Sequence, residues 1–389
     1  MRLYLPENVL DASLNRIRRL FDEFPRVVVD ISGGKDSTVV YNLALQVAAE
    51  KNRLPLDVRF VDQEAEWDCV IDHVRECLHD PRVRGHWLQV PIVISNGTST
   101  DQPWLHCWRD GDDWIRPKEA DSIHENIYGT NRFVRLFEAH GLHHWGDEPL
   151  AILCGVRAQE SPARTKGLTT YPTYKDITWG RVVSRQRDHY VFHPIYDWHY
   201  EDVWKAIHDH RWPYCPLYDY MYQHGRPAHL MRVSSVHHET AIVQLTFLQE
   251  IEPDTWDRLT ARISGTNAVN QAKELYKCPR DLPPMFASWR EYRDHLLDTL
   301  IEPDTREIFR KQFEADDHIW QPYFMPRVIK MHIASLLVND YHGVKNSTFG
   351  AANREHKIRG GANRDRLTNA FAYAERRAAA AVPLPPDAD

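Results

Sequence analysis

The sequence lacks the cysteine patterns that bind zinc or iron–sulfur clusters. Its six cysteines are scattered over 389 residues, and no two of them are separated by only two residues. Zinc knuckles and cluster-binding segments depend on such pairs, so we expect no iron–sulfur cluster and mostly structural, reduced thiols. The six are Cys69, Cys77, Cys107, Cys154, Cys215 and Cys278.

Long apolar runs are also absent. No run approaches the roughly 20 residues that cross a bilayer, and residues 1–11 carry early charges and a proline instead of the apolar core of a signal peptide. We therefore predict a cytoplasmic protein that does not enter a membrane. The net charge of −7 gives no general reason to expect a nucleic acid partner.

Two common phosphate-binding motifs are missing, since the chain has neither GxxxxGK[ST] nor GxGxxG. A glycine pair stands instead between an expected strand and an expected helix. The β-branched run 27–31 predicts a central parallel strand, and apolar residues recur at helical spacing over 39–48. Gly33 and Gly34 remove side chains at the bend, so backbone N–H groups can face an anion at the start of the helix.

The side chains of this turn suit a phosphate and a metal ion. Lys35 adds a positive charge, and Ser32 and Ser37 add hydroxyl donors. Asp36 supplies a hard oxygen ligand of the kind that Mg²⁺ prefers. The alternative is a glycine-rich turn that binds nothing.

The stretch Ser32–Ser37 reads SGGKDS and resembles, without a substitution, the SGGxDS pattern of the PP-loop in the N-type ATP pyrophosphatases. Its lysine narrows the resemblance to the branch of the phosphoadenosine phosphosulfate (PAPS) reductases and ATP sulfurylases. The resemblance implies an α/β fold of the adenine nucleotide alpha hydrolase type, with a Rossmann-like parallel sheet and helices on both faces. It also implies that residues 32–37 hold the phosphates of ATP, or of PAPS, with Mg²⁺ at Asp36.

A second segment, Gly155–Ser161, resembles the pattern Gly-(Leu/Ile)-Arg-x-x-(Glu/Gln)-Ser of the same family. The chain keeps Gly155, Arg157, Glu160 and Ser161, and we predict that these four residues contact the nucleotide. Arg157 is a planar donor at the end of an expected strand, which suits a phosphate or sulfate group. Arg164 and Lys166 follow, as a second cationic cluster or as an exposed basic loop.

A third candidate is Asp62, which closes the expected strand 54–61 at the edge where α/β sheets meet their ligands. In the resembled family an acidic residue at this position lies near the nucleotide. Glu64 and Glu66 follow, either as further site residues or as caps of a helix expected over 67–78.

The segment 86–95 is expected to be a third strand. After it, the insertion 96–127 is rich in aromatic and basic residues, and we expect it to face the substrate or to pack against the domain.

The length and an ordinary composition, 42% hydrophobic and 26% charged, allow a large α/β domain and a smaller one. We divide the chain into a PP-loop domain (1–229), a helical region (230–350) and a basic, then Ala- and Pro-rich tail (351–389). Helices are expected over 266–276, 289–315 and 326–341.

Residues 339–345 resemble part of a small C-terminal domain in the immunoglobulin-binding-regulator A group of PAPS-reductase-like proteins. Residues 353–377 hold seven Lys or Arg against three acidic residues, which indicates a solvated helix or a contact with nucleic acid or a partner.

These features predict an enzyme that cleaves ATP at the α-phosphate, releases pyrophosphate and transfers AMP or the adenylyl group to an acceptor of unknown identity. The catalytic residues of such a transferase would be Lys35, Asp36 and Arg157. The loop amides and Mg²⁺ would stabilise the leaving pyrophosphate.

Two alternatives stay open. One is reduction of PAPS or adenylyl sulfate, or a sulfotransferase-like reaction, although the Glu-Cys-Gly-(Leu/Ile)-His motif of the reductases is missing here. The other is a nucleotide-sensing regulator. The resemblance to the immunoglobulin-binding-regulator A group implies for it a ParB/sulfiredoxin-like protein partner.

Overall fold

The computed structural model describes residues 6–96, 104–170, 172–184, 188–237, 245–263, 266, 278–337, 340, 346, 349–350, 353 and 356–358. By its internal contacts the chain divides into two compact units, Met1–Asn270 and Gln271–Asp389. The three-part division at residues 229 and 350 stays a prediction.

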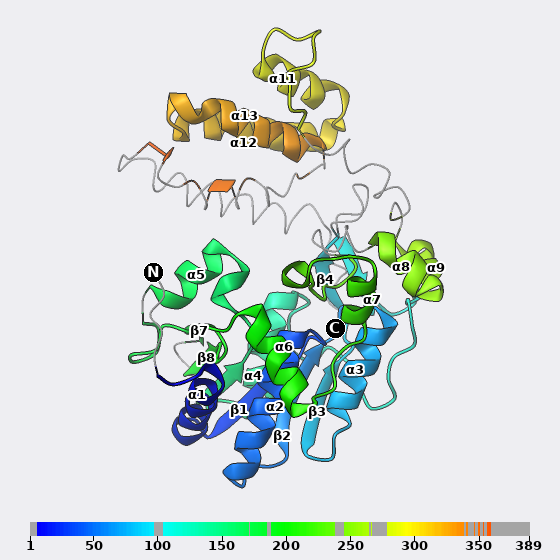
Figure 1. The fold of residues 1–389 in the computed structure, drawn as a ribbon. Helices are drawn as coiled ribbons and strands as arrows, with labels where there is room; N and C mark the ends of the chain where they lie inside the picture. Colours follow the sequence, from blue (N-terminus) through cyan, green and yellow to red (C-terminus); the bar gives the residue numbers. More distant parts are fainter. Residues whose placement is uncertain are drawn as a thin grey trace. The chain divides into compact units, whose positions relative to one another are not determined.

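A six-stranded sheet forms the centre of the first unit, with the strand order β3-β2-β1-β6-β8-β7 (Figure 1). Its strands are β1 (Arg26–Asp30), β2 (Leu56–Val61), β3 (Val83–Leu88), β6 (Leu150–Leu153), β7 (Gly180–Ser184) and β8 (His189–Phe192). All neighbours pair in parallel except β7, which runs antiparallel to β8 at one edge. The predicted α/β fold with a parallel sheet is confirmed, and β7 is an element that the sequence pattern did not predict.

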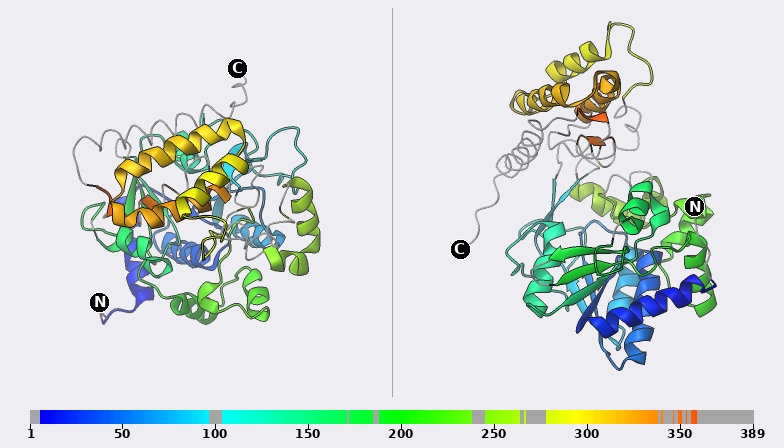
Figure 2. Two further views of the ribbon diagram at one scale, coloured as in Figure 1. Left: turned by 90° about the horizontal axis from the view of Figure 1, so that it is seen from above. Right: turned by 90° about the vertical axis from the view of Figure 1, so that its left-hand side faces the viewer.

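Helices cover both faces of this sheet (Figure 2). On one face α1 (Val9–Glu23), α2 (Lys35–Glu50), α3 (Asp68–Leu78) and α6 (Tyr200–His210) share a buried apolar cluster that includes Val29. On the other face, Trp145 of α4 (Phe133–Trp145) packs with Val28 and Ile152. Successive residues of a strand point to opposite faces, so the β-branched run of β1 serves both layers. Further helices of this unit are α5 (Pro162–Thr169), α7 (Leu217–Gln223), α8 (Leu245–Ile251) and α9 (Pro253–Arg262).

The prediction of one strand over 86–95 is wrong. Strand β3 ends at Leu88, and β4 (Ile92–Ser95) pairs antiparallel with β5 (Trp104–Cys107) in a separate two-stranded sheet. Pro91 stands between β3 and β4, and a proline offers no N–H to a sheet ladder. The chain therefore leaves the central sheet at this point.

In the second unit the described residues form a helical region, as predicted, with α11 (Trp289–Thr299), α12 (Pro303–Ile319) and α13 (Met325–Leu337). Leu297, Phe309 and Leu336 join these helices in one buried cluster. The segment 289–315 is helical as predicted, but it is divided between two helices, because Pro303 starts a new helix at its first turn, where the missing N–H does no harm.

Several predictions fall on residues outside the described ones. These are the helix expected over 267–276, most of the basic segment 353–377, and most of the segment 339–345. Among the helices that the structure describes, none is both long enough and apolar enough to cross a membrane.

Candidate functional site

The glycine pair forms the turn between β1 and α2. Gly33 has a φ of +71°, and a Cβ there would lie 2.6 Å from Cγ1 of Val70 in α3, so the angle and the space both require glycine. Gly34 is the N-cap of α2. The loop therefore wraps the N-terminus of a long helix, where the helix dipole favours an anion.

Two serines brace this loop. The Ser32 N–H donates to Ser37 Oγ (3.2 Å), and Ser37 Oγ donates to the Gly34 carbonyl (2.9 Å). The two hydroxyl oxygens are 3.1 Å apart. Ser37 is buried whereas Ser32 is exposed, so Ser32 presents the hydroxyl that a ligand can reach.

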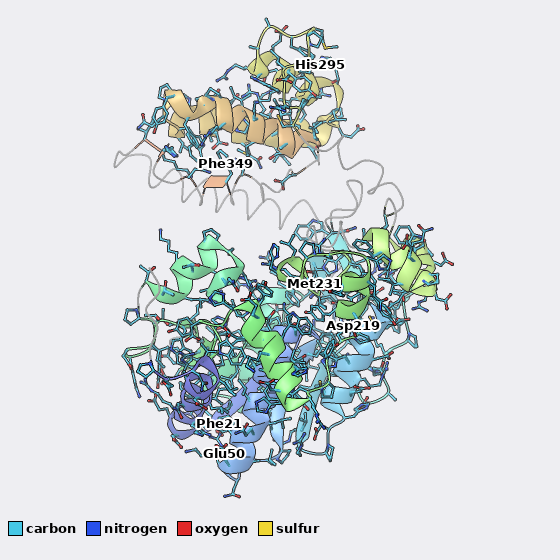
Figure 3. All side chains as sticks on the ribbon, in the orientation of Figure 1. Phe21, Glu50, Asp219, Met231, His295 and Phe349 are labelled. Carbon is cyan, nitrogen blue, oxygen red and sulfur yellow. The ribbon has the colours of Figure 1, made fainter. Side chains whose placement is uncertain are left out.

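Lys35 points into the protein and not along the loop surface. Its Nζ donates to Asp36 Oδ2 (3.0 Å) and to the Met231 carbonyl (3.3 Å), and its side chain is only 3% exposed. Its backbone N–H donates to the hydroxyl of Tyr218 in α7 (2.9 Å). Burial lowers the pKa of Lys35. Lys35 thus ties the loop to α7 and to residues 231–237, which we call the strap; Met231 is labelled in Figure 3.

Asp36 lies between two cations. Its Oδ2 accepts from Lys35, and its Oδ1 accepts from Arg157 Nε at 2.5 Å. Arg157, which the second motif predicts as a nucleotide contact, therefore pairs with a residue of the loop. A carboxylate has about four acceptor sites, and these two bonds leave room at Asp36, which is 17% exposed, for a further ligand.

Gly155 allows this meeting, because it lets the end of β6 approach the start of α2. A Cβ at Gly155 would lie 2.5 Å from the Asp36 carbonyl carbon and from the Ser37 nitrogen. Both are backbone atoms, so no side-chain rotation makes room for a methyl group. The two predicted motifs are thus in van der Waals contact through their backbones.

Glu160 and Ser161 position the arginines around them. Glu160 Oε1 accepts from the Arg157 N–H (2.8 Å), and Ser161 Oγ caps α5 by accepting from the Arg164 N–H (3.2 Å). The Arg164 side chain pairs with Glu160, and Arg232 donates to the Glu160 carbonyl (3.0 Å). The guanidinium groups of Arg164 and Arg232 therefore lie against Glu160, and that of Arg157 lies against Asp36, which makes this side of the site attractive to an anion.

Asp62 closes β2 as predicted, but it is fully buried and bonded to protein groups. Its Oδ1 accepts from the Glu64 N–H (2.9 Å). Its Oδ2 accepts from Trp87 Nε1 (2.9 Å) and Gln89 Nε2 (3.0 Å) and pairs with Arg116. None of these partners belongs to the loop, and a contact of Asp62 with the nucleotide stays a prediction.

Glu64 anchors the insertion to the domain. Its carboxylate, fully buried, accepts from the Trp108 N–H (2.8 Å) and from Arg262 Nε of α9 (2.8 Å). Trp108 is itself fully buried, and its Nε1 donates to the Asp62 carbonyl (2.9 Å). At these residues the insertion packs against the domain, which is one of the two expectations for it.

Glu66 holds the strap. Ser235 Oγ donates to Glu66 Oε1, and the Val236 N–H donates to the Ala65 carbonyl (2.9 Å). Burial raises the pKa of Glu66 to about 8. The carboxyl is therefore mostly protonated at neutral pH, and its ionisation places a charge against the segment that receives Lys35.

This pKa predicts that the wild-type protein loses stability between about pH 5 and about pH 8 more steeply than Glu66→Gln. The folded state keeps the Glu66 proton up to about pH 8 while the unfolded chain releases it near its ordinary 4.5, so stability decreases as the pH rises. Between these two pH values the free energy of unfolding, measured by urea titration, should decrease by about 3 kcal/mol more in the wild type than in Glu66→Gln. Glu76→Gln, an exposed change on α3, should leave the profile unaltered, and equal slopes for wild type and Glu66→Gln would contradict the prediction.

Five of the six thiols are held in their protonated form. Burial raises the pKa of Cys77 to about 12 and also raises those of Cys107, Cys154 and Cys278, and a hydrogen bond with the Cys215 thiol raises that of Cys69. Because a thiol attacks as the thiolate, these five are poor nucleophiles at neutral pH.

Tyr218, Met231 and Arg232 are site residues that the sequence analysis did not select. Tyr218 and Met231 reach Lys35 from 183 and 196 residues along the chain. No local spacing can signal contacts of that range.

The chain matches two known domain families. Residues 26–224 match the phosphoadenosine phosphosulfate reductase domain, and residues 225–358 match a domain of unknown function (DUF3440). The uncharacterized protein YbdN of Escherichia coli (strain K12) is 29% identical over 340 residues, with 82% of each chain covered. Because that relative is itself uncharacterized, it does not test the resemblance to the immunoglobulin-binding-regulator A group, which stays a prediction.

Solved structures with a related fold share little sequence with this chain. The FMN adenylyltransferase of Candida glabrata, in complex with FAD and inorganic pyrophosphate, is 14% identical with a TM-score of 0.36. That match covers 57% of this chain and 64% of the adenylyltransferase. The phosphoadenylyl-sulfate reductase of Candida auris, in a phosphate complex, is 14% identical with a TM-score of 0.31, over 56% of this chain and 94% of the reductase. Similarities of this size carry no argument about activity.

Proposed function

Since the chain belongs to the phosphoadenosine phosphosulfate reductase domain family, we propose that it binds an adenine nucleotide at residues 32–37 and cleaves ATP at the α-phosphate. Pyrophosphate leaves, and AMP or the adenylyl group passes to an acceptor. The observation that carries the proposal is the position of Asp36, at the N-terminus of α2 between Lys35 and Arg157.

The chemistry needs positive charge where pyrophosphate leaves, and the site supplies it from several directions. The N-terminus of α2 and the guanidinium group of Arg157 lie at Asp36, and the guanidinium groups of Arg164 and Arg232 lie against Glu160, in the motif that contains Arg157. Lys35 is buried, so its part is to fix Asp36 and the loop backbone. Fixed charges of this kind stabilise a transition state without reorganising during the reaction.

The donor set also fits a Mg²⁺ ion. Asp36 has acceptor sites left after its two hydrogen bonds, and the exposed Ser32 hydroxyl is a neutral oxygen donor. When bound with the nucleotide, the ion supplies charge neutralisation on the phosphate oxygens.

Reduction of PAPS or adenylyl sulfate is less well supported as a second function. It needs a nucleophilic thiolate, whereas the pKa values of five thiols lie above their usual range. A nucleotide-sensing regulator, with a ParB/sulfiredoxin-like partner or a nucleic acid bound through residues 353–377, uses the same nucleotide site without turnover. Product formation separates the regulator from the enzyme.

The test is the conversion of ATP labelled at the α-phosphate into labelled AMP or a labelled acceptor, with unlabelled pyrophosphate measured beside it, in the presence of Mg²⁺, alone and with cell extract or DNA as a source of acceptor. We expect Lys35→Met and Asp36→Asn to lower the rate at least about 100-fold, since each removes a group that fixes charge at the reacting phosphates. Lys166→Met, a matched change of an exposed lysine on α5, should retain the wild-type rate. Tight nucleotide binding with no labelled product under any of these conditions would overturn the proposal and favour the regulator.

A further inference from the structure

Three histidine rings converge between the edge strand β3 and helix α4, on the sheet face opposite α2. His86 comes from β3, and His140 and His144 come from successive turns of α4. Each offers a side-chain nitrogen, and these nitrogens lie within 4.8 Å of one another. The ring centroids of His140 and His144 are 4.3 Å apart, and each is 5.1 Å from that of His86.

The central ring of this group has a buried nitrogen that the protein leaves without a partner. His140 is fully buried, and its Nε2 makes no hydrogen bond among the described residues. A buried polar atom in that state is unfavourable unless a ligand or a hydrogen-bond partner satisfies it. The position therefore calls for a ligand to the imidazole.

His86 is held as metal-binding histidines usually are. Its Nε2 contacts Asp57 Oδ1 at 3.0 Å, and Asp57 is further held by Arg84 (3.2 Å). A carboxylate bound to one ring nitrogen fixes the ring and makes the other nitrogen a better ligand. The arrangement of Asp57 and His86 therefore leaves Nδ1 as the donor atom of His86.

We propose that His86, His140 and His144 bind a divalent transition-metal ion of the zinc class. Imidazole nitrogens suit zinc, copper and nickel, whereas Mg²⁺ and Ca²⁺ prefer oxygen. With Zn–N bonds of about 2.0 Å the three nitrogens would stand about 3.4 Å apart. His144 is exposed and sits in the last turn of α4, so it can move to close this distance and leaves a fourth position for water.

The charges around the cluster allow a cation there. The nearest positive charge is Arg59, whose Nη1 is 3.3 Å from His140 Nδ1, but Arg59 pairs with both oxygens of Asp30 (2.8 and 3.0 Å). When His140 binds the metal through Nε2, its proton lies on Nδ1, so Arg59 no longer donates to that nitrogen. Arg59 Nη1 keeps its hydrogen bond to the Phe137 carbonyl (2.8 Å). The C-terminal end of α4 also favours positive charge.

The ion would join α4 to the edge of the sheet, apart from the loop site, so its test does not depend on turnover. Protein stripped with a chelator is titrated with Zn²⁺ against a chromophoric chelator, and Co²⁺ is used as a spectroscopic probe of four-coordinate geometry. We expect wild type to bind one ion per chain and His144→Ala to lose affinity by about 100-fold. Asp57→Asn, which changes the carboxylate partner of His86 and of Arg84 but removes no proposed metal ligand, should lose about tenfold.

His143→Ala is the matched control, because His143 is the exposed neighbour of His144 on the same helix but lies outside the cluster. It should bind Zn²⁺ as the wild type does. Zn²⁺ at a hundredfold excess over Kd should raise the unfolding temperature of wild type and His143→Ala by about 5 °C, and that of His144→Ala by much less. Folded wild-type protein that takes up no ion, or an equal loss of affinity in His143→Ala and His144→Ala, overturns the proposal.

Discussion

Gly155→Ala is expected to lower pyrophosphate release from ATP about 100-fold, because a displacement of about 1 Å at a reacting group has an effect of that size. The new Cβ would meet the backbone of Asp36 and Ser37 at 2.5 Å. An ordinary contact there needs about 1 Å more, so the end of β6 and the start of α2 must separate. The separation stretches the 2.5 Å bond between Arg157 and Asp36.

Gly167→Ala is the matched control for this change. Gly167 lies in α5, and a Cβ there meets nothing within 4 Å, so the substitution should keep full activity and gain slightly in helix stability. Circular dichroism and nucleotide binding, measured beside turnover, separate a local displacement from global unfolding. If Gly155→Ala matches Gly167→Ala in rate, affinity and unfolding temperature, the close contact between the two motifs has no functional weight.

The parts of the site that the sequence predicted are those set by near neighbours. Gly33 turns the chain at a φ of +71°, which is a local requirement, and α2 begins directly after Gly34, as a helix was predicted to follow the glycine pair. Arg157 was predicted by resemblance to a family motif, and the structure places it against Asp36. Its pairing is a tertiary fact that one sequence cannot give by spacing.

What the sequence could not predict is the direction of Lys35. Its chemistry suggested a charge beside the loop amides, whereas the structure buries it against Tyr218 and Met231. Those partners belong to α7 and to the strap, and the strap lies in the segment that matches a domain of unknown function. The wrong prediction of one strand over 86–95 has a simpler cause. The side-chain alternation typical of a strand continues through Pro91, whereas the hydrogen bonds of the sheet cannot, because proline has no N–H.

Arg116→Met is expected to destabilise the protein by about 3–5 kcal/mol, the usual effect of leaving one member of a buried ion pair without its partner. Arg116 Nη2 pairs with Asp62, its Nη1 donates to the Glu64 carbonyl (2.5 Å), and its guanidinium lies 5.1 Å from the Trp108 ring centre. Asp62 is fully buried and would keep only neutral hydrogen-bond donors. The measurement is the free energy of unfolding in urea. Lys118→Met, a neighbouring lysine over Trp114, should change it by less than about 1 kcal/mol.

The double variant Asp62→Asn/Arg116→Met distinguishes two roles of Asp62. In one, Asp62 stabilises the fold through its ion pair with Arg116, and in the other its carboxylate contacts the nucleotide. Once Asp62 no longer carries a charge, the loss of Arg116 destabilises the protein less. The sum of the two single losses in the free energy of unfolding should therefore exceed the loss in the double variant by about 2 kcal/mol. Because every described partner of Asp62 is a protein group outside the loop, the folded double variant should bind ATP as the wild type does. Additive effects on stability would contradict the pairing. A selective loss of ATP affinity would instead show that Asp62 contacts the nucleotide, and the strand end would then contribute to the ligand site directly.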